Sequence, residues 1–530
     1  MESNGLVNMN TAIVLFRKIL RIHDNPLLEW ASKSENFDSI LPIYIMKNDW
    51  LKDNNQNLSP IRKKFQYESI IDLNKSLVEK YDSELLIFNG NSLEIIESLC
   101  ECIQGKKILL TDYCSNPENR TIEDELKYLS ERYNGFNYEI FPAINTILDI
   151  EKTIKSDVYR NPKSMQDMHK IFDDFFEKYP SGHVIEPSID NPQEIYTDKK
   201  QIKYLKSNSL ISKLYIPISL IEKSIPSVPK SYFIGGETEA LKRFRTKISN
   251  SPDYVKEFRK PSTISTNVES KPMEPTTTGL SPYISTGCIS VRLVWNECMT
   301  IYSSGSHSKP PESLIGQLMF REMFYLLSRS VNNWDNDTGN SNCKQIKWGE
   351  YDKFFINAWE EGNTGFPYID AMMRQLNSTG WMHHLGRHAV SCFLTRGQLW
   401  QNWKYGRDIF ERKLVDSDWA INNGNWLWLA GVAPFSMPYY RIYNPCPDSK
   451  SSLNAETERA NFIRHWVPEL AKFPSKHIFE PHLAPIGVQN KSGCVIGKDY
   501  PNPIIDRKKA RKENISNFKN SLNNISNNKR

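Results

Sequence analysis

Short apolar runs alternate with amphipathic segments along the first part of the chain. The apolar runs are long enough for buried strands, and they lie at residues 12–16, 40–45, 85–88 and 108–110. Between them the apolar positions recur at helical spacing, for example over 62–80 and 92–102. Strands separated by helices predict parallel crossover connections. We therefore expect a doubly wound α/β domain with a parallel sheet over residues 10–140.

The pattern changes twice after residue 140. Residues 141–235 are rich in Lys, Ser, Pro and Asn and hold few long periodic runs, which predicts a long interdomain linker. Residues 236–515 are helical in pattern and rich in aromatic side chains, so we expect an all-α domain there. Residues 516–530 are rich in Lys, Asn and Ser and are predicted to form a disordered tail.

Composition narrows the class of protein only slightly. A net charge of +5 over 530 residues permits a nucleic-acid-binding surface without demonstrating one. Nine scattered cysteines without CxxC spacing indicate a reducing compartment. The first residues lack the basic and apolar regions of a secretory signal, and no apolar stretch is long enough to span a bilayer. We expect a protein that is neither secreted nor embedded in a membrane.

Candidate reactive side chains are concentrated between residues 348 and 444. His384 and His388 are four residues apart, so they share one face of a helix and suit proton transfer near neutral pH. The same spacing also fits metal ligation or an ordinary polar helix face. Asp416 and Asp418 could pair with Arg387 beside a polar ligand, or they could form a solvated acidic turn that caps a helix. Spacing alone decides neither case.

Ordered motifs through this segment resemble the flavin-binding core of photolyases and cryptochromes. The matching stretches are 364–371, 380–390, 392–400, 416–419 and 422–426. Upstream, 16–18 and 20–26 are similar to the N-terminal signature of that family, and 277–283 is similar to its turn around the FAD phosphates. The stretches 316–322 and 494–501 also fit. The resemblance therefore extends, in the family's order, over residues 12–515.

The resemblance implies that FAD binds inside the helical domain. The residues at the matching cofactor positions are Thr277, Thr278, Gly279, Leu280, Ser281, Gln317, Arg321, Arg387, Asp416, Asp418 and Asn422. By the same resemblance, Arg387 would pair with Asp416 beside the flavin ring, and Asn422 would face flavin N5. The N-terminal domain could also carry a second, antenna chromophore, either a deazaflavin or a folate.

Four tryptophans match the chain that carries electrons from the surface of such proteins to the excited flavin. They are Trp426, Trp403, Trp348 and Trp400. A relay of this kind needs closely packed, oxidisable rings that step from the interior to the surface. Because a single tryptophan is more often plain core, this expectation rests on all four together.

The two histidines indicate the branch of the family. His384 and His388 match the histidine pair of (6-4) photolyases, whereas cyclobutane-dimer photolyases carry Asn and Met at these positions. The resemblance thus implies light-driven repair of (6-4) photoproducts in UV-damaged DNA, with both histidines assisting proton transfer. Substrate contacts would come from Gln317, Phe320, Trp426 and Arg441, although Phe320 stands where the family usually has Trp.

Two alternatives within the family stay open. Animal-type cryptochromes retain both histidines, so the chain could be a blue-light photoreceptor that acts through protein partners; against this, the chain stops soon after the family core. Residues 437–445 look more like the cyclobutane-dimer branch, which makes such a photolyase the other alternative. We expect a monomer that works in the nucleus, or else in the cytoplasm. The basic run 507–512 is either an import signal or a solvated helix face.

Classes outside the family are disfavoured. The first predicted strand leads into Arg17 and Arg21 rather than into a GxGxxG turn, which argues against a dinucleotide-binding dehydrogenase. A zinc enzyme would need a third ligand near His384 and His388, and the sequence offers no recognisable one. We therefore expect no metal site.

Overall fold

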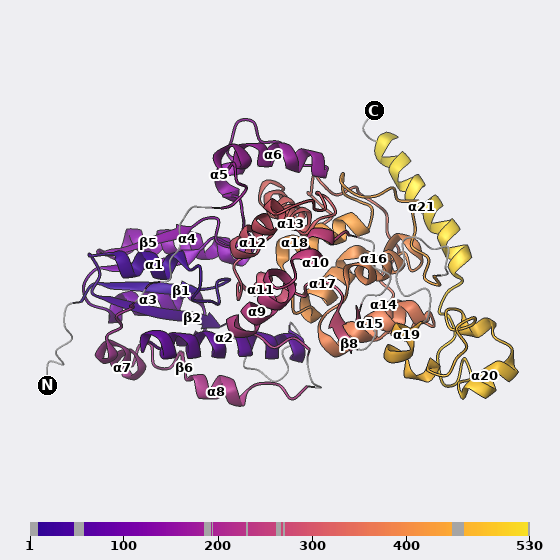
Figure 1. The fold of residues 1–530 in the computed structure, drawn as a ribbon, viewed down its shortest axis with the longest axis horizontal. Helices are drawn as coiled ribbons and strands as arrows, with labels where there is room; N and C mark the ends of the chain where they lie inside the picture. The colour runs from indigo at the N-terminus through magenta and orange to yellow at the C-terminus, as the bar shows by residue number, and fades with distance from the viewer. Residues whose placement is uncertain are drawn as a thin grey trace.

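An α/β layer, which contains β1, and a helical layer, which contains α21, lie side by side (Figure 1). The computed structural model describes residues 9–46, 58–184, 192, 194–228, 232–260, 267–268, 271–447 and 460–527. The chain passes from one layer to the other after β5, and later segments return to the first layer. The predicted class, a parallel α/β domain joined to an all-α domain, is confirmed.

The α/β layer is built on a six-stranded sheet in the order β5-β4-β1-β2-β3-β6. Its strands are β1 Thr11–Phe16, β2 Ser39–Met46, β3 Leu86–Asn89, β4 Lys107–Asp112, β5 Phe136–Phe141 and β6 Tyr215–Ile216. All pairs are parallel except β3 with β6. The four predicted strands are confirmed as β1 to β4. The sequence pattern missed β5, because this strand is half-exposed and contains no continuous apolar run.

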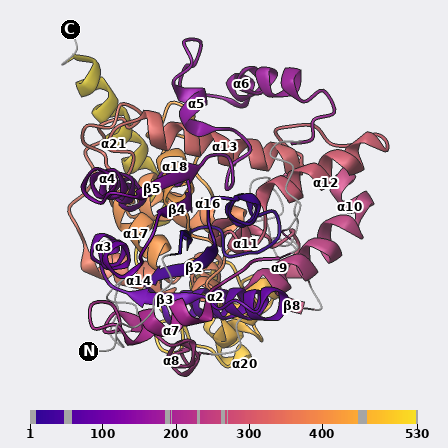
Figure 2. The ribbon, with the colours of Figure 1, turned by 90° about the vertical axis from the view of Figure 1, so that its left-hand side faces the viewer.

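Side chains that alternate along β1 separate the two faces of the sheet. Ala12, Val14 and Phe16 pack in one core with α1 Pro26–Lys33 and α2 Pro60–Tyr81. Ile13 and Leu15 pack in a second core with α3 Ser92–Cys102 and α4 Pro117–Arg132. Figure 2 shows α3 and α4 together on one side of the strands.

Three of these helices begin at the same sequence signal. The side chains of Asn25, Ser59 and Asn116 accept hydrogen bonds from backbone N–H groups of the first turn, and each is followed by a proline at the first helical position. A proline there costs no hydrogen bond, because that N–H has no partner within the helix. Local sequence therefore fixes where these helices start.

The stretch expected as a linker, residues 141–235, contains several folded elements. They are α5 Ile150–Ile154, α6 Met165–Lys178, α7 Lys199–Ser207, β6 and α8 Ile218–Lys223. The end of this stretch returns to the α/β layer, since β6 pairs with β3 and Ile202 and Leu205 of α7 join the second core. The division of the chain at residues 140, 235 and 515 stays a prediction.

The helical layer runs from residue 237 to the end of the described chain. Its elements are α9 Glu237–Phe244, η1 Arg245–Ser249, α10 Pro252–Glu257, β7 Asn267–Val268, β8 Lys271–Pro275, α11 Ser281–Thr286, α12 Val291–Ser303, α13 Leu314–Ser330, α14 Lys353–Glu361, α15 Pro367–Thr379, α16 His384–Cys392, η2 Phe393–Gly397, α17 Trp403–Lys413, α18 Trp419–Leu429, α19 Asn461–Trp466, η3 Pro468–Leu470, η4 Pro481–Leu483, α20 Ile486–Ser492 and α21 Arg507–Asn527. Helices α13, α16, α17 and α18 form its centre (Figure 1).

The predicted disordered tail is wrong for residues 516–527. Helix α21 continues through them, and Phe518 on this helix is 1% exposed. The Phe518 ring stacks on Tyr439 with 4.8 Å between ring centroids. Asn514 and Ser521 lie on the same buried face, four residues before and three after. A composition rich in Lys and Asn concealed this sparse buried stripe; residues 528–530 lie outside the described residues.

The cysteines and the apolar character of the helices add two further observations. All nine cysteines are buried and none forms a disulfide. Within the described ranges, no helix combines the length and apolar character that a membrane span requires.

Candidate functional site

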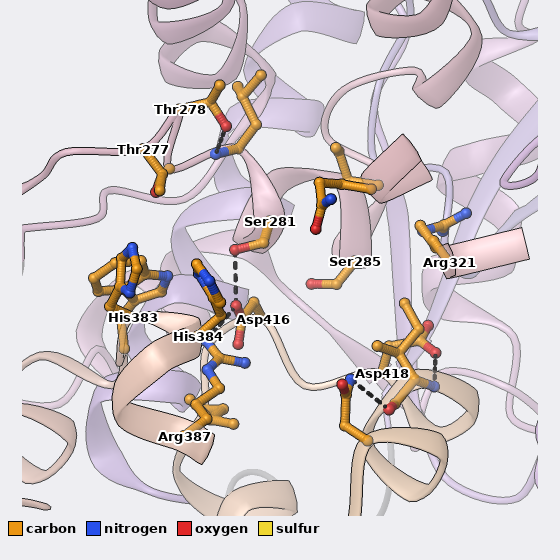
Figure 3. A pocket seen from close by; sticks show the side chains of 18 of the residues that line it. Thr277, Thr278, Ser281, Ser285, Arg321, His383, His384, Arg387, Asp416 and Asp418 are labelled. Atoms are coloured by element: carbon orange, nitrogen blue, oxygen red, sulfur yellow. Dashed lines mark hydrogen bonds and ion pairs between the residues drawn. The ribbon is translucent and has the colours of Figure 1, made fainter. Parts of the chain in front are cut away.

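A cavity of about 330 Å³ opens in the centre of the helical layer. Its walls come from the turn before α11, from α13, from α16 and from the segment that leads into α18 (Figure 3). The structure brings all of the predicted cofactor residues to these walls: Thr277, Thr278, Gly279, Leu280, Ser281, Gln317, Arg321, Arg387, Asp416, Asp418 and Asn422. Their individual roles stay predictions.

The turn before α11 is held by an arginine that sequence reasoning missed. Arg243 of α9 donates from Nη1 to the carbonyl oxygen of Thr278, 3.2 Å away. Gly279 has a φ of +63°, and a Cβ there would lie 2.8 Å from the same Arg243 nitrogen. The positive φ favours glycine at this position, and the absent side chain leaves room for Arg243. This turn presents Thr277, Thr278 and Ser281 to the cavity (Figure 3).

The predicted ion pair of Arg387 with Asp416 is confirmed. Arg387 Nη2 lies 2.7 Å from Asp416 Oδ2, and Arg387 Nε donates to the carbonyl oxygen of Met382 at 2.8 Å. Ser281 Oγ donates to the same carboxylate oxygen at 2.7 Å. Three separate segments of the chain are thereby joined at one edge of the cavity (Figure 3).

Asp418 is held by a lysine from the other layer. Lys18, directly after β1, places Nζ 2.8 Å from Asp418 Oδ2, and Tyr325 of α13 donates to that oxygen at 2.6 Å. Burial by itself would raise the pKa of Asp418, but the charges of Lys18 and Arg321 and these hydrogen bonds lower it to about 2. The α/β layer thus supplies the counter-charge for a carboxylate of the cavity.

The sequence contained a weak signal for Lys18. It follows the carboxyl end of the first strand of a parallel sheet, where ligands and functional groups gather. Nothing local indicated its partner, which lies 400 residues further along the chain.

Asn422 is oriented by α17. Its side-chain nitrogen donates to the carbonyl oxygen of Arg407 and to Glu411 Oε2, both at 3.1 Å. These two bonds fix the plane of the amide, and the residue lines the cavity. Its predicted position opposite flavin N5 stays a prediction.

Three histidines lie close together on α16 and its N-cap, namely His383, His384 and His388. The ring centroids of His383 and His384 are 4.3 Å apart, and those of His384 and His388 are 5.8 Å apart. His388 Nδ1 hydrogen bonds the hydroxyl of Tyr443 at 2.8 Å. Among the residues that the structure describes, no group of three or more His, Cys, Asp or Glu side chains could hold a metal ion.

The histidines differ electrostatically from what their spacing suggested. Burial is the main cause that lowers the pKa of His384 and of His388 well below 6.5, and the charge of Lys260 adds to it. Both rings are therefore neutral at pH 7 in the protein alone, rather than poised to titrate there.

Lys260 is a second residue that the sequence did not reveal. It lines the cavity with its Nζ 5.9 Å from the ring centroid of Trp428 and 6.0 Å from that of Phe320. Burial, and then the charge of Arg387, lowers the pKa of Lys260 to about 8. The ammonium is still mostly charged at pH 7, which makes this side of the cavity electropositive.

Only two of the four predicted substrate residues lie at the cavity. Gln317 and Trp426 line the cavity, whereas Phe320 and Arg441 do not. Phe320 packs instead against Trp428, with ring centroids 6.0 Å apart and 14° between the planes. Arg441 has an exposed side chain, and its carbonyl oxygen accepts a hydrogen bond from Arg396 at 2.8 Å.

The four predicted relay tryptophans differ in solvent exposure, from buried beside the cavity to partly exposed. Trp426 lines the cavity and is 1% exposed, and Trp403 is fully buried at the start of α17. Trp348 and Trp400 are partly exposed, with 4.9 Å between their ring centroids. Gly406 of α17 lets Trp426 approach, since a Cβ there would meet its ring at 2.1 Å.

Unsatisfied polar atoms show that the cavity suits a polar ligand. Asp416 Oδ1, His383 Nε2 and His384 Nε2 are buried and have no hydrogen-bond partner in the described structure. Burying such an atom without a partner costs about 1–3 kcal/mol. FAD offers donors, acceptors and phosphates together with a large apolar ring, so the residues present fit the expected cofactor.

Comparison with known families gives two matches within the chain. Residues 12–182 match the family described as DNA photolyase. Residues 314–520 match the family described as the FAD binding domain of DNA photolyase. The second match contains the cavity residues of α13, α16 and α18.

Individual relatives and structures agree with these matches. The chain is 37% identical to a (6-4) DNA photolyase of Arabidopsis thaliana, over 96% of this chain and 89% of the relative. It is 32% identical to cryptochrome-1 of Gallus gallus, over 96% of this chain and 78% of the relative. In structure it resembles a cryptochrome of Synechocystis with a TM-score of 0.79 at 24% identity, covering 96% of this chain and 99% of that one. A photolyase of Sulfolobus tokodaii, solved with two FAD molecules, gives a TM-score of 0.69 at 23% identity, covering 96% of this chain and 100% of that one.

Proposed function

Because the chain belongs to the DNA photolyase/cryptochrome family, we propose that it is a (6-4) photolyase, which uses light and FAD to repair (6-4) photoproducts in DNA. The observation that carries the lesion class is the pair His384 and His388 on one cavity wall. Two imidazoles that can contact one ligand can donate and accept the protons that this repair transfers.

The residues around the cavity bind and orient the cofactor in this proposal. Bound FAD supplies light-driven electron transfer. The turn at Thr277, Thr278 and Ser281 would hold its phosphates, and the Arg387–Asp416 pair would flank its ring system. Asp418, kept ionised by Lys18, provides a fixed acceptor on the opposite wall.

His384 and His388 then hold and move protons at the lesion. Both rings are neutral before substrate arrives, so each carries one N–H. Negative charge that develops on a substrate atom beside the rings raises their pKa, so that a ring can take up a proton from water and then pass it to that atom. The hydroxyl of Tyr443 fixes the orientation of His388 through Nδ1.

The tryptophans renew the reduced cofactor in this proposal, and Trp403 is the fully buried one of the four. Trp403→Phe is expected to abolish photoreduction of bound FAD, because phenylalanine is not oxidised under these conditions. FAD content and repair after chemical reduction are expected to stay as in the wild type. Absorbance during blue-light illumination with an external donor measures the loss.

A matched control is Trp466→Phe, since Trp466 is also buried but lies on α19 away from the cavity. It should photoreduce like the wild type. Normal photoreduction in the Trp403 variant would remove Trp403 from the route.

Further parts of the proposal concern partners and location. UV-damaged DNA is the substrate, bound by a monomer in the nucleus, and its binding should weaken as salt concentration rises. The exposed side chains of Lys508, Lys509, Arg511 and Lys512 at the start of α21 are the candidate import signal. A second chromophore, a deazaflavin or a folate, would occupy the α/β layer.

A second candidate function is that of a cryptochrome photoreceptor. Its specific support is the similarity to animal cryptochrome-1 proteins over nearly the whole chain. Such a protein would bind and photoreduce FAD but would act through protein partners.

One repair assay distinguishes these functions. FAD-loaded protein is illuminated with oligonucleotides that carry either a (6-4) photoproduct or a cyclobutane dimer, with dark controls. Restoration of the (6-4) lesion alone is the expected result. Restoration of the dimer alone would contradict the assigned lesion class, and repair of neither, with FAD bound and photoreducible, would favour the cryptochrome function.

A further inference from the structure

His383 has a structural task that fixes the chemical form of its ring. It is the residue immediately before α16, and its Nδ1 accepts a hydrogen bond from the backbone N–H of Leu385 at 3.2 Å. The ring is 1% exposed and packs between His384 and Trp381. The side chain therefore caps the helix, a role usually taken by Ser, Thr, Asp or Asn.

The cap determines where the proton of this imidazole lies. A ring nitrogen that accepts a hydrogen bond carries no proton, so the proton of neutral His383 is on Nε2. Burial, with the charges of Lys260 and Arg387, lowers the pKa of His383 to about 3. The ring is thus a neutral Nε2–H donor across the physiological pH range.

This donor points at the cavity and lacks an acceptor. His383 is one of the cavity-lining residues (Figure 3), and its Nε2 is buried without a hydrogen-bond partner in the described part of the chain. Buried N–H groups in folded proteins are almost always paired. The missing partner is therefore expected on the ligand that fills the cavity.

The surrounding charge indicates which kind of acceptor fits. Lys260 contributes a positive charge, and within the described ranges no carboxylate lies within ion-pair distance of it. The charge of Arg387 is offset by Asp416, so one cation stays uncompensated on this wall. The N-terminal end of α16 adds partial positive charge at the same place. An anionic oxygen is favoured over a neutral one.

We propose that His383 donates a hydrogen bond from Nε2 to a phosphate oxygen of the ligand in the cavity, either in the diphosphate of FAD or in the DNA backbone beside the lesion. The proposal rests on the proposed function for the identity of these two ligands. It adds a positioning residue whose donor state is set by helix capping rather than by pH.

Three variants separate the cap from the donor. In His383→Asn, the side-chain oxygen can replace Nδ1 and cap α16, but no donor remains at the place of Nε2. In His383→Gln, the amide nitrogen reaches about as far as Nε2 and restores the donor. His383→Ala removes both groups.

Binding to the full-length protein is measured with four probes. FAD, ADP and riboflavin are titrated into FAD-free protein, and lesion-containing DNA is titrated into the FAD-loaded protein. Loss of a hydrogen bond to a charged group weakens binding about 10-fold or more. His383→Asn is expected to show this loss for FAD and ADP if the acceptor is the cofactor's diphosphate, or for DNA alone if it is a backbone phosphate.

In both cases His383→Gln should regain most of the affinity, and His383→Asn should bind riboflavin like the wild type. FAD-free His383→Asn should have the same melting temperature as the FAD-free wild type. Unchanged affinity for FAD, ADP and DNA in His383→Asn would overturn the proposal. A loss shared equally by riboflavin would also overturn it, because the acceptor would then be on the flavin ring. Repair activity is measured separately, so that a protein that binds FAD as expected but repairs nothing refutes the proposed function alone.

Discussion

Replacing His384 by alanine is expected to lower the rate of (6-4) repair by about 10²–10⁴-fold, the usual contribution of a positioned proton donor. His384 lines the cavity with a buried Nε2 that has no hydrogen-bond partner among the described residues, so this atom is available to a substrate. FAD should still bind, because the Arg387–Asp416 pair and the turn at Thr277 do not depend on His384. Single-turnover repair of a (6-4) oligonucleotide by FAD-loaded, reduced protein measures the loss.

The matched control is His183→Ala, since His183 hydrogen bonds Thr300 and is not among the cavity residues. It should repair like the wild type. Near-normal repair by the His384 variant would show that proton transfer depends on another group, and loss of bound FAD would assign His384 to cofactor binding instead.

Replacing Lys18 by methionine is expected to lower the free energy of unfolding by about 3–5 kcal/mol at pH 7, because removing one partner leaves a buried charge without its ion-pair partner. The charge left behind is on Asp418, whose side chain is 1% exposed. Tyr325 and Arg321 lie near Asp418 in the same helical layer, whereas Lys18 belongs to the α/β layer, so the variant also loses a link between the two layers. Urea denaturation of the FAD-free protein, followed by tryptophan fluorescence, measures the difference.

The pH dependence of this difference has a definite sign. In the wild type the pKa of Asp418 is lowered to about 2 from 3.8, so its contribution to stability is present above pH 3.8 and is lost as pH falls through 2. Without Lys18, burial raises the pKa of Asp418 and the carboxyl protonates earlier. The stability difference between wild type and variant should therefore shrink as pH is lowered from 7 toward 4.

Lys75→Met is the control, because Lys75 pairs with Glu79 at the surface with both side chains about two-thirds exposed (68% and 66%). Such a pair contributes little to stability, so no clear shift is expected. A Lys18 variant with the same free energy of unfolding as the wild type at pH 7 would contradict the role of Lys18 as counter-charge. So would a stability difference between variant and wild type that does not change with pH.

Much of the architecture was encoded locally in the sequence. Buried runs of three to six residues between amphipathic segments predicted β1 to β4, because strand and helix periods are properties of the chain itself. The pairs Asn25-Pro26 and Asn116-Pro117 also fix helix starts locally, through a capping side chain followed by a proline. The ordered motifs also identified the cavity residues, although the spacing of His384 and His388 alone left metal binding and a plain polar face open.

Other features depended on which segments meet in three dimensions. The stability of β5 and of α21 comes from neighbours distant in the sequence, such as Tyr439 against Phe518, and no local period revealed them. The charge state of His384 was set by burial and by Lys260, which lies on a different segment, so its neutrality could not be deduced from its own helix. The same holds for Asp418, whose counter-charge comes from a strand end 400 residues away. The sequence thus determined most of the elements, the family and the chemical groups of the site. The tertiary structure decided the protonation and partners of those groups, because burial and Coulomb interactions depend on distance in space rather than along the chain.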